Sequence, residues 1–242
     1  MVNGRACLWQ RHVRRLQTGC ERLGIQRPDA DTLRLEAASL VGLQKKGVLK
    51  LILTRGDSER GYAVPDDIHP NRIMYFSDWP DALQARADAG VRLRFCNTRM
   101  GMNPSTAGIK HLNRLEQVLA RKEWQDDSII EGLMQDGQDK VVEGTMSNLF
   151  IEQEGKLLTP ELSQSGVAGV VRGLVLEIAE QMGEPVSQQR LTTDDLLQAH
   201  ACYITNSLLG VRQVASLERR RFNASSTMHR ILKAAAARVF DA

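Results

Sequence analysis

Stretches with helical and strand-like hydrophobic periodicity follow one another along this chain without the strict alternation of parallel α/β folds. Apolar residues recur at steps of three and four over residues 9–23, which predicts a helix with one apolar face. A second helix is predicted from a cap at Asp31 or Thr32 to Gly47, and the short aliphatic run at 48–53 then predicts a buried strand. Because helices and strands mix in this way, the sequence predicts two α+β domains rather than a doubly wound sheet.

The sequence Trp79-Pro80-Asp81 interrupts this pattern after a further predicted strand at 72–77. We therefore predict a small α+β domain over residues 1–83 and a larger domain over 84–242. In the larger domain, short strands divided by Gly and Asp turns are interspersed with helices. The strands are predicted at 91–96, 128–134, 140–142, 149–151, 156–158 and 202–205, and the helices at 110–119, 170–182 and 226–240, the last capped by Ser225.

Composition excludes several classes of protein. Of the 242 residues, 25% are charged and 42% are hydrophobic, which is ordinary globular usage and excludes disorder and fibrous repeats. No apolar run is long enough for a transmembrane helix, and no apolar segment of a secretory signal follows the charges near the N-terminus. The four cysteines form no CxxC pair and the histidines lack ligand-like spacing, so neither a disulfide scaffold nor a metal site is predicted. We expect a cytoplasmic enzyme with reduced thiols.

The segment GVAGVVR at 166–172 combines two glycines with the start of a predicted helix. Glycine permits close approach of a ligand to the backbone, and the first amide groups of a helix bind phosphate well. The segment is neither a Walker motif nor a GxGxxG sequence after a strand, so a plain turn-to-helix junction remains the alternative.

Lys110 follows a loop of small residues at 105–108 and is expected at the start of the helix 110–119. The dipole at a helix start disfavours a charged amine, which lowers the pKa of a lysine and makes a neutral nucleophile easier to obtain. Such an amine can form a Schiff base with a carbonyl compound. The alternative is an exposed surface lysine without a chemical role.

Two further side chains are candidates for the same kind of site. Glu143 lies at a turn between two predicted strands, where Thr145, Ser147 and Asn148 could surround a buried carboxylate. Arg15 lies beside the apolar face of the first predicted helix, so its guanidinium could reach into a cleft. A polar hairpin turn and a boundary arginine whose stem covers apolar surface remain the alternatives for these residues.

Basic residues suggest a function of another class, the binding of nucleic acid. Positive side chains cluster in the helix 9–23 and at 219–221, and the formal net charge of the chain is +3. Counterion release makes such patches bind phosphates non-specifically. However, Glu21 and Glu218 lie close by, and no helix-turn-helix or RNP sequence accompanies the patches, which disfavours this function.

The candidate residues also occur together in an order that resembles a known family. This order, which includes Lys110, Glu143 and the 166–172 segment, resembles the fold-type IV pyridoxal-phosphate enzymes, among them the branched-chain and D-amino acid aminotransferases. The strings that carry the resemblance are AGIKHLNRLEQVL at 107–119, GVLK at 47–50, RGY at 60–62 and TNSLLGV at 205–211. The string around Lys110 is the most specific, because the branched-chain enzymes typically place a Gly-Asn-Tyr pattern where this chain has Leu-Asn-Arg-Leu.

The resemblance implies roles for individual residues and a cofactor between the small and the large domain. Lys110 would bind the aldehyde of pyridoxal 5'-phosphate covalently, and Glu143 would face the ring nitrogen and keep it protonated. Val167 would pack on one face of the ring. The residues implied for the cofactor phosphate are Arg15, Val170 and Val171 through their backbone amides, Asn206 and Ser207.

Within this family, the strings most resemble the lyases that convert 4-amino-4-deoxychorismate to 4-aminobenzoate and pyruvate for folate synthesis. Lys110 would then act as general base, and Arg60 and Arg99 are candidate ligands of the substrate carboxylates. A solvated turn residue is the alternative for Arg60. For the whole chain, the alternative is a D-amino acid or branched-chain aminotransferase that uses the same residues. The resemblance also implies a homodimer with its sites near the interface.

Members of this family carry a few tens of residues before the position that Met1 matches. The sequence Val2-Asn3-Gly4 resembles the turn that follows the family's first strand. We therefore expect the small domain of this sequence to lack that first strand region.

Overall fold

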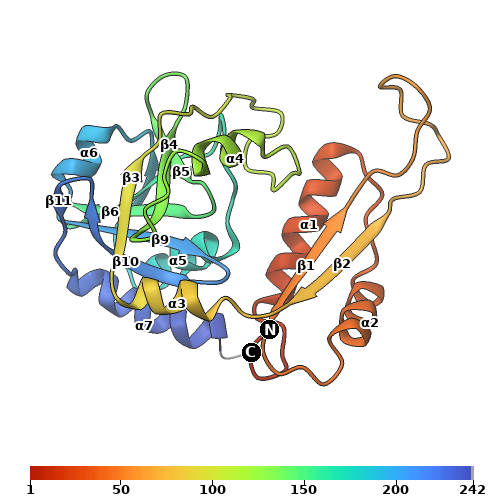
Figure 1. Cartoon of the computed structure of the whole chain (residues 1–242), viewed down its shortest axis with the longest axis horizontal. Coiled ribbons are helices and arrows are strands. Elements are labelled where there is room, and N and C mark those ends of the chain that lie inside the picture. The colour runs from red at the N-terminus through yellow and green to blue at the C-terminus, as the bar shows by residue number, and fades with distance from the viewer. Residues whose placement is uncertain (241–242) are drawn as a thin grey trace. The chain divides into compact units, whose positions relative to one another are not determined.

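The computed structural model describes residues 1–240 and divides them into two compact units (Figure 1). The first unit is Met1–Pro80 and the second begins at Asp81. This division lies at the point where the sequence Trp79-Pro80-Asp81 interrupts the hydrophobic pattern. The boundary expected after residue 83 falls a little further on, inside helix α3 (Asp81–Asp88).

The first unit contains two helices and a two-stranded sheet, with α2 in contact with β2. Its elements are α1 (Trp9–Leu23), α2 (Ala30–Val41), β1 (Val48–Leu53) and β2 (Arg72–Ser77). The strands pair antiparallel, with Leu51 opposite Met74. The buried apolar side chains of the helices are those of Val13, Cys20, Leu33, Ala37 and Val41. The predicted helix 9–23 and the predicted strands 48–53 and 72–77 are therefore confirmed.

Three expectations for the first unit are wrong: the cap of α2, the end of α2 and the burial of β1. The cap of α2 is Asp29 rather than Asp31 or Thr32, because the Asp29 carboxylate accepts a hydrogen bond from the Thr32 amide at 2.7 Å. The helix ends at Gly42, whose φ is 55°, and not at Gly47. β1 is only half-buried, since within residues 1–240 it pairs with β2 alone and no wider sheet covers it.

The second unit is built on one mixed sheet. Its strands are β3 (Val91–Phe95), β4 (Ile129–Gln135), β5 (Val141–Gly144), β6 (Asn148–Gln153), β7 (Lys156–Pro160), β8 (Val186–Gln189), β9 (Ala201–Asn206), β10 (Gly210–Leu217) and β11 (Arg220–Arg221). They follow the order β5-β4-β3-β10-β9-β6-β7-β8, with β11 paired to β10. β3 is parallel to β4 and β10, β7 is parallel to β8, and the remaining pairs are antiparallel. This mixture confirms the prediction of an α+β fold.

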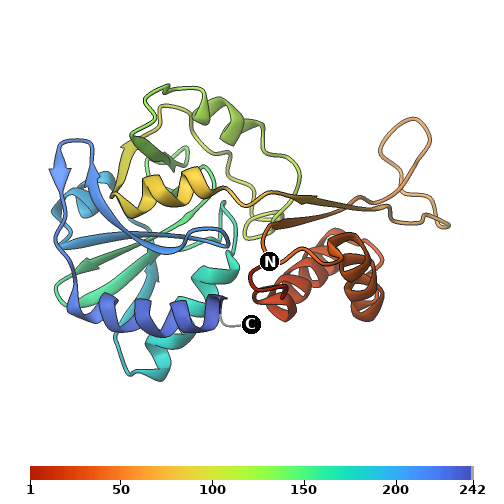
Figure 2. The same cartoon turned by 60° about the horizontal axis from the view of Figure 1, so that its bottom comes forward.

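Helices of the second unit pack on this sheet and on one another. Besides α3 they are α4 (Leu115–Arg121), α5 (Val170–Gln181), α6 (Thr193–Gln198) and α7 (Ser226–Phe240). α5 contacts α7, β8 and β9, and α7 contacts β10 (Figure 2). The hydroxyl of Ser225 accepts a hydrogen bond from the Met228 amide at 3.0 Å, which confirms the predicted cap of the last helix. None of the helices in the described part of the chain is long and apolar enough to cross a membrane.

Several elements of the second unit are absent from the sequence-based prediction, namely α3, α6, β8, β10 and β11. β8 illustrates the reason, because three of its four side chains are exposed and show no apolar alternation. It is a strand because it pairs in parallel with β7, a contact that no local pattern encodes.

Candidate active site

Glu143 lies within β5, one residue before its end, and not in the turn expected from the sequence, and its carboxylate is buried. Of the polar neighbours expected around it, Thr145 and Ser147 donate to Glu131 instead. The Oε2 atom of Glu143 accepts hydrogen bonds from the Val167 amide and from the Asn148 side-chain amide, each at 2.9 Å. The same Asn148 nitrogen also donates to the Val167 carbonyl at 2.8 Å. These bonds hold the carboxylate against the segment that precedes α5.

The segment that carries Lys110 is joined to the same place. Gly108 forms a parallel bridge with Val167. Its amide donates to the Gly166 carbonyl and its carbonyl accepts from the Ala168 amide, each at 2.9 Å. Lys110 follows closely, and its positive charge acts on Glu143. The structure thus brings together three residues that the sequence singled out, which are Lys110, Glu143 and Val167.

Lys110 does not begin a helix, which corrects the sequence-based expectation. α4 starts only at Leu115. The residues before it are irregular because the guanidinium of Arg114 donates to the carbonyl groups of His111 at 3.1 Å and Ile109 at 3.0 Å. The argument from the helix dipole therefore does not apply to Lys110, whose side chain is exposed in the single chain.

Burial raises the pKa of Glu143 to about 7. The hydrogen bond from the Val167 amide and the charges of Arg114 and Lys110 oppose this rise, whereas the nearby carboxylate of Glu131 adds to it. In such a low-dielectric place a carboxylate attracts a cationic N–H group more strongly than it would in water. The site therefore suits a protonated ring nitrogen.

The start of α5 has the features of an anion site. The N-cap residue is Gly169, so no side chain accepts hydrogen bonds from the first amides of the helix. The amides of Val170 and Val171 also lack acceptors within the helix, because they belong to its first turn. A Cβ atom at position 169 would overlap the Oδ1 atom of Asn148, so this position requires glycine. Across β6 and β9, Asn148 pairs with Thr205, whose buried hydroxyl has no hydrogen-bond partner within the described chain. A phosphate oxygen would satisfy these groups, and the residues present fit pyridoxal phosphate.

Asn206 is the last residue of β9, and Ser207 begins the turn between β9 and β10. The Asn206 Oδ1 atom accepts hydrogen bonds from the amides of Leu208 at 2.9 Å and Leu209 at 2.7 Å, so this oxygen holds the turn. Ser207 is half-buried in the same turn. The turn keeps both residues beside Thr205, and their role in phosphate binding stays a prediction.

The three arginines predicted for the site have different surroundings. Arg15 is half-buried on α1 in the first unit, where its Nη2 atom lies 3.4 Å from Nδ1 of His12 and burial lowers its pKa. Arg60 is exposed in the connection between β1 and β2. Arg99 belongs to the second unit and forms an ion pair with Asp139 at 2.7 Å. Arg99 is therefore already engaged by a carboxylate of its own chain.

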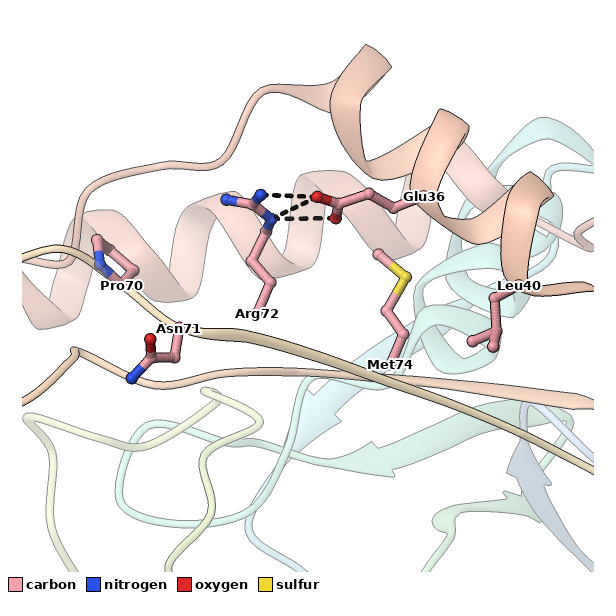
Figure 3. Close-up of a pocket in the computed structure, with 6 residues that line it drawn as sticks. All are labelled: Glu36, Leu40, Pro70, Asn71, Arg72 and Met74. Carbon is pink, nitrogen blue, oxygen red and sulfur yellow. Dashed lines mark hydrogen bonds and ion pairs between the residues drawn. The ribbon is translucent and has the colours of Figure 1, made fainter.

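A hollow of ≈ 440 Å³ lies in the first unit between α2 and β2 (Figure 3). Its lining residues are Glu36, Leu40, Pro70, Asn71, Arg72 and Met74. Figure 3 shows the Arg72 guanidinium and the Glu36 carboxylate pointing toward each other. They form an ion pair, with 2.6 Å between Nη2 of Arg72 and Oε1 of Glu36. Because the two charges satisfy each other and no predicted site residue lines the hollow, we assign it no ligand.

Sequence reasoning gave no role to two residues that the structure places in the site. Thr205 could have been noticed in the sequence, because it is a hydroxyl residue directly after the apolar stretch 201–204. Arg114 had none, because its partners are backbone carbonyl groups and leave no trace in the pattern of side chains.

Comparison with known proteins agrees with this geometry. Residues 1–217 match the family model of amino-transferase class IV, and the chain belongs to this family. The chain is 37% identical over 209 residues to aminodeoxychorismate lyase of Vibrio harveyi, which covers 86% of this chain and 77% of that protein. The crystal structure of 4-amino-4-deoxychorismate lyase from Pseudomonas aeruginosa is 39% identical with a TM-score of 0.92, covering 99% of this chain and 88% of that one. D-alanine aminotransferase of Bacillus licheniformis is 26% identical, covering 90% of this chain and 76% of that protein.

The family match confirms the resemblance that the sequence strings predicted, and the structural match confirms the fold of the type IV enzymes. Pyridoxal phosphate is the cofactor of this class of enzyme, as expected from the strings. The roles of individual residues remain predictions at this point.

Proposed function

We propose that this chain is a pyridoxal-phosphate-dependent lyase that converts 4-amino-4-deoxychorismate to 4-aminobenzoate and pyruvate. The observation that carries the choice of reaction is the similarity to two such lyases, at 37% and 39% identity. The D-alanine aminotransferase is less similar, at 26%. The buried Glu143 beside the Lys110 segment supports the cofactor in either case.

When bound, pyridoxal phosphate supplies a ring that withdraws electrons from the carbon bearing the substrate amine. In this proposal the Nζ atom of Lys110 attaches the cofactor, Glu143 holds a proton on the ring nitrogen, and Val167 packs on the ring. The phosphate ligands are Arg15, the amides of Val170 and Val171, Asn206 and Ser207, joined by the hydroxyl of Thr205.

The reaction itself depends on a proton moved by this chain. Lys110 Nζ, which becomes free when the substrate amine replaces it on the cofactor, would remove the proton from the carbon that bears that amine, acting as general base. The C–O bond on the neighbouring carbon would then break, so that the three-carbon group leaves with its oxygen as an enolate and takes up a proton, which the Lys110 ammonium can return, to become pyruvate. The remaining ring becomes aromatic, which drives the step. For the substrate carboxylates we favour Arg60 over Arg99, because Arg99 is already paired with Asp139.

The test is to load the purified protein with pyridoxal phosphate and add 4-amino-4-deoxychorismate. Pyruvate, followed through lactate dehydrogenase, and 4-aminobenzoate, followed by fluorescence, should appear in equal amounts, and Lys110→Ala should produce neither. If the wild-type protein releases no more pyruvate than Lys110→Ala but transfers amino groups from a D- or branched-chain amino acid to 2-oxoglutarate, the aminotransferase alternative is correct.

We further propose that the enzyme is a homodimer in the cytoplasm. The support for the dimer is an apolar face, made of Leu112, Leu115, Val118 and Leu119 on and just before α4, whose side chains are between 47% and 65% exposed in the single chain. Contiguous exposed apolar surface is typical of protein interfaces. The support for a reducing compartment is that Cys7, Cys20, Cys96 and Cys202 are free thiols.

A further inference from the structure

Arg114 stands where the irregular segment after Lys110 becomes α4. Its carbonyl group begins the helix by accepting from the Val118 amide at 3.1 Å. Its guanidinium turns back along the chain, where Nε donates to the His111 carbonyl at 3.1 Å and Nη2 donates to the Ile109 carbonyl at 3.0 Å. One side chain therefore binds the backbone on both sides of Lys110.

We propose that Arg114 is a positioning residue that fixes the backbone of Lys110 so that its amine meets the cofactor in one orientation. A lysine side chain has several rotatable bonds, so its reach is defined only if its backbone is held. Before Lys110 the chain is held by the bridge between Gly108 and Val167. After Lys110 no helix or strand continues, and the guanidinium of Arg114 takes over this role.

The surroundings of Arg114 argue for a role in the site rather than in the general stability of the fold. The side chain is half-buried, and burial lowers its pKa while the Glu143 carboxylate opposes that effect. In turn, the charge of Arg114 lowers the pKa of Glu143. The guanidinium thus lies close enough to both predicted cofactor residues to affect each of them, one through its backbone and the other through its charge.

The inference rests on the proposed attachment of the cofactor to Lys110, but not on the choice between lyase and aminotransferase. Its test is Arg114→Met, with Arg121→Met as the matched control. Arg121 is the last residue of α4, the helix that Arg114 precedes, and it also donates to a backbone carbonyl, that of Trp124 at 2.9 Å, away from Lys110. The probe is pyridoxal, which lacks the phosphate and so reports on the amine rather than on the phosphate site.

Two readouts are compared at equal protein concentration. The first is capture of pyridoxal on Lys110, trapped with borohydride and located by peptide mapping. The second is hydrogen exchange of the backbone amides of residues 108–111 and 166–168 in the protein without cofactor. Arg114→Met should weaken the capture by about tenfold and speed exchange in these segments, because two hydrogen bonds from a charged donor are lost. Arg121→Met should match the wild type in both.

Arg114→Lys separates charge from geometry, since it keeps the charge but cannot hold both carbonyl groups in the same way. A partial loss of capture with partly increased exchange supports the proposal, and this variant decides the matter if Arg114→Met does not fold. Wild-type capture and exchange in Arg114→Met, or equal losses in Arg121→Met, would overturn it. If the wild type itself gives no adduct on Lys110, the cofactor attachment is wrong, and hydrogen exchange alone still shows whether Arg114 holds the segment.

Discussion

Glu143 makes the stability of the protein without cofactor depend on pH. Its pKa in the folded chain is about 7, above the ordinary value of 4.5, because burial disfavours its charged form. The folded state therefore holds the proton more tightly than the unfolded state. The stability that follows is complete below pH 4.5 and is lost as the pH rises to about 7.

We expect Glu143→Gln to abolish this pH-dependent loss of stability, because the side-chain amide of glutamine stays neutral across the whole pH range. Between about pH 4.5 and 7, the free energy of unfolding of the variant should rise relative to wild type by about 3 kcal/mol. Denaturant titrations of both cofactor-free proteins across this range measure the difference. The buried Glu131 is present in both proteins, so its own contribution largely cancels. A difference that stays constant with pH would show that Glu143 is ionised in the folded state throughout.

At the scale of residues, the sequence predicted which side chains form the candidate site better than it predicted their hydrogen bonds. Lys110 could be found because it stands in a distinctive string of neighbours, and Glu143 because polar residues follow it between two predicted strands. Thr205 stands out in the sequence as a hydroxyl residue, but its lack of a hydrogen-bond partner could not be predicted. The same holds for the bonds of Arg114 to the backbone, since both depend on contacts that only the folded chain creates. Polar bonding of this kind is set by tertiary structure rather than by local sequence.

At the scale of elements, the start of α5 offers a test with a control in the same helix. Gly169 has a φ of −64°, which any residue can adopt, so the need for glycine here is steric and comes from Asn148. Gly173 lies one turn later, and a methyl group there would meet open space. The same substitution should therefore have opposite effects at the two positions.

We expect Gly169→Ala to lower the free energy of unfolding by about 1–3 kcal/mol, because the methyl group forces Asn148 away from Glu143 and Val167. It should also weaken the binding of pyridoxal phosphate. Gly173→Ala should raise the free energy of unfolding by about 0.5–1 kcal/mol through helix propensity and leave cofactor binding unchanged. Denaturant titration and cofactor titration test both variants. Equal effects at the two positions would contradict the proposed contact between Gly169 and Asn148.

The ends of α2 and α4 show why element boundaries were harder to predict than the elements themselves. Asp29, Asp31 and Thr32 are all residues that favour helix caps, and only the folded backbone selects Asp29. For α4, the apolar spacing of Leu112, Leu115 and Val118 is helical, yet the side chain of Arg114 removes the carbonyl groups that the first turn would use. Periodicity predicts a helix but does not reveal such competition for its backbone.

At the scale of the whole molecule, the division into two α+β units was predictable because the hydrophobic pattern is interrupted at Trp79-Pro80-Asp81. The order of the strands was not. β10 pairs with β3, which lies far away in sequence, and β6 pairs with β9 across α5 and α6. Such pairings follow from which apolar faces can be buried together, and the faces of short strands are too alike for sequence to select among them.

The apolar face on and just before α4 predicts how the whole molecule associates. Its four side chains recur at helical spacing but face solvent in the single chain, so burial against a second copy would remove apolar surface from water. We expect sedimentation of the wild-type protein to show a dimer, and Val118→Glu to weaken its association by at least about tenfold, because a charge would be buried without a partner. Leu35→Glu, at another exposed apolar position, on α2, is the control and should stay dimeric. A monomeric wild-type protein, or a Val118→Glu variant that associates as tightly as Leu35→Glu, would mean that this face has another partner.

Because Lys110 lies just before this face, loss of the dimer should also change the exposure of Lys110 to pyridoxal, which the same borohydride trapping detects.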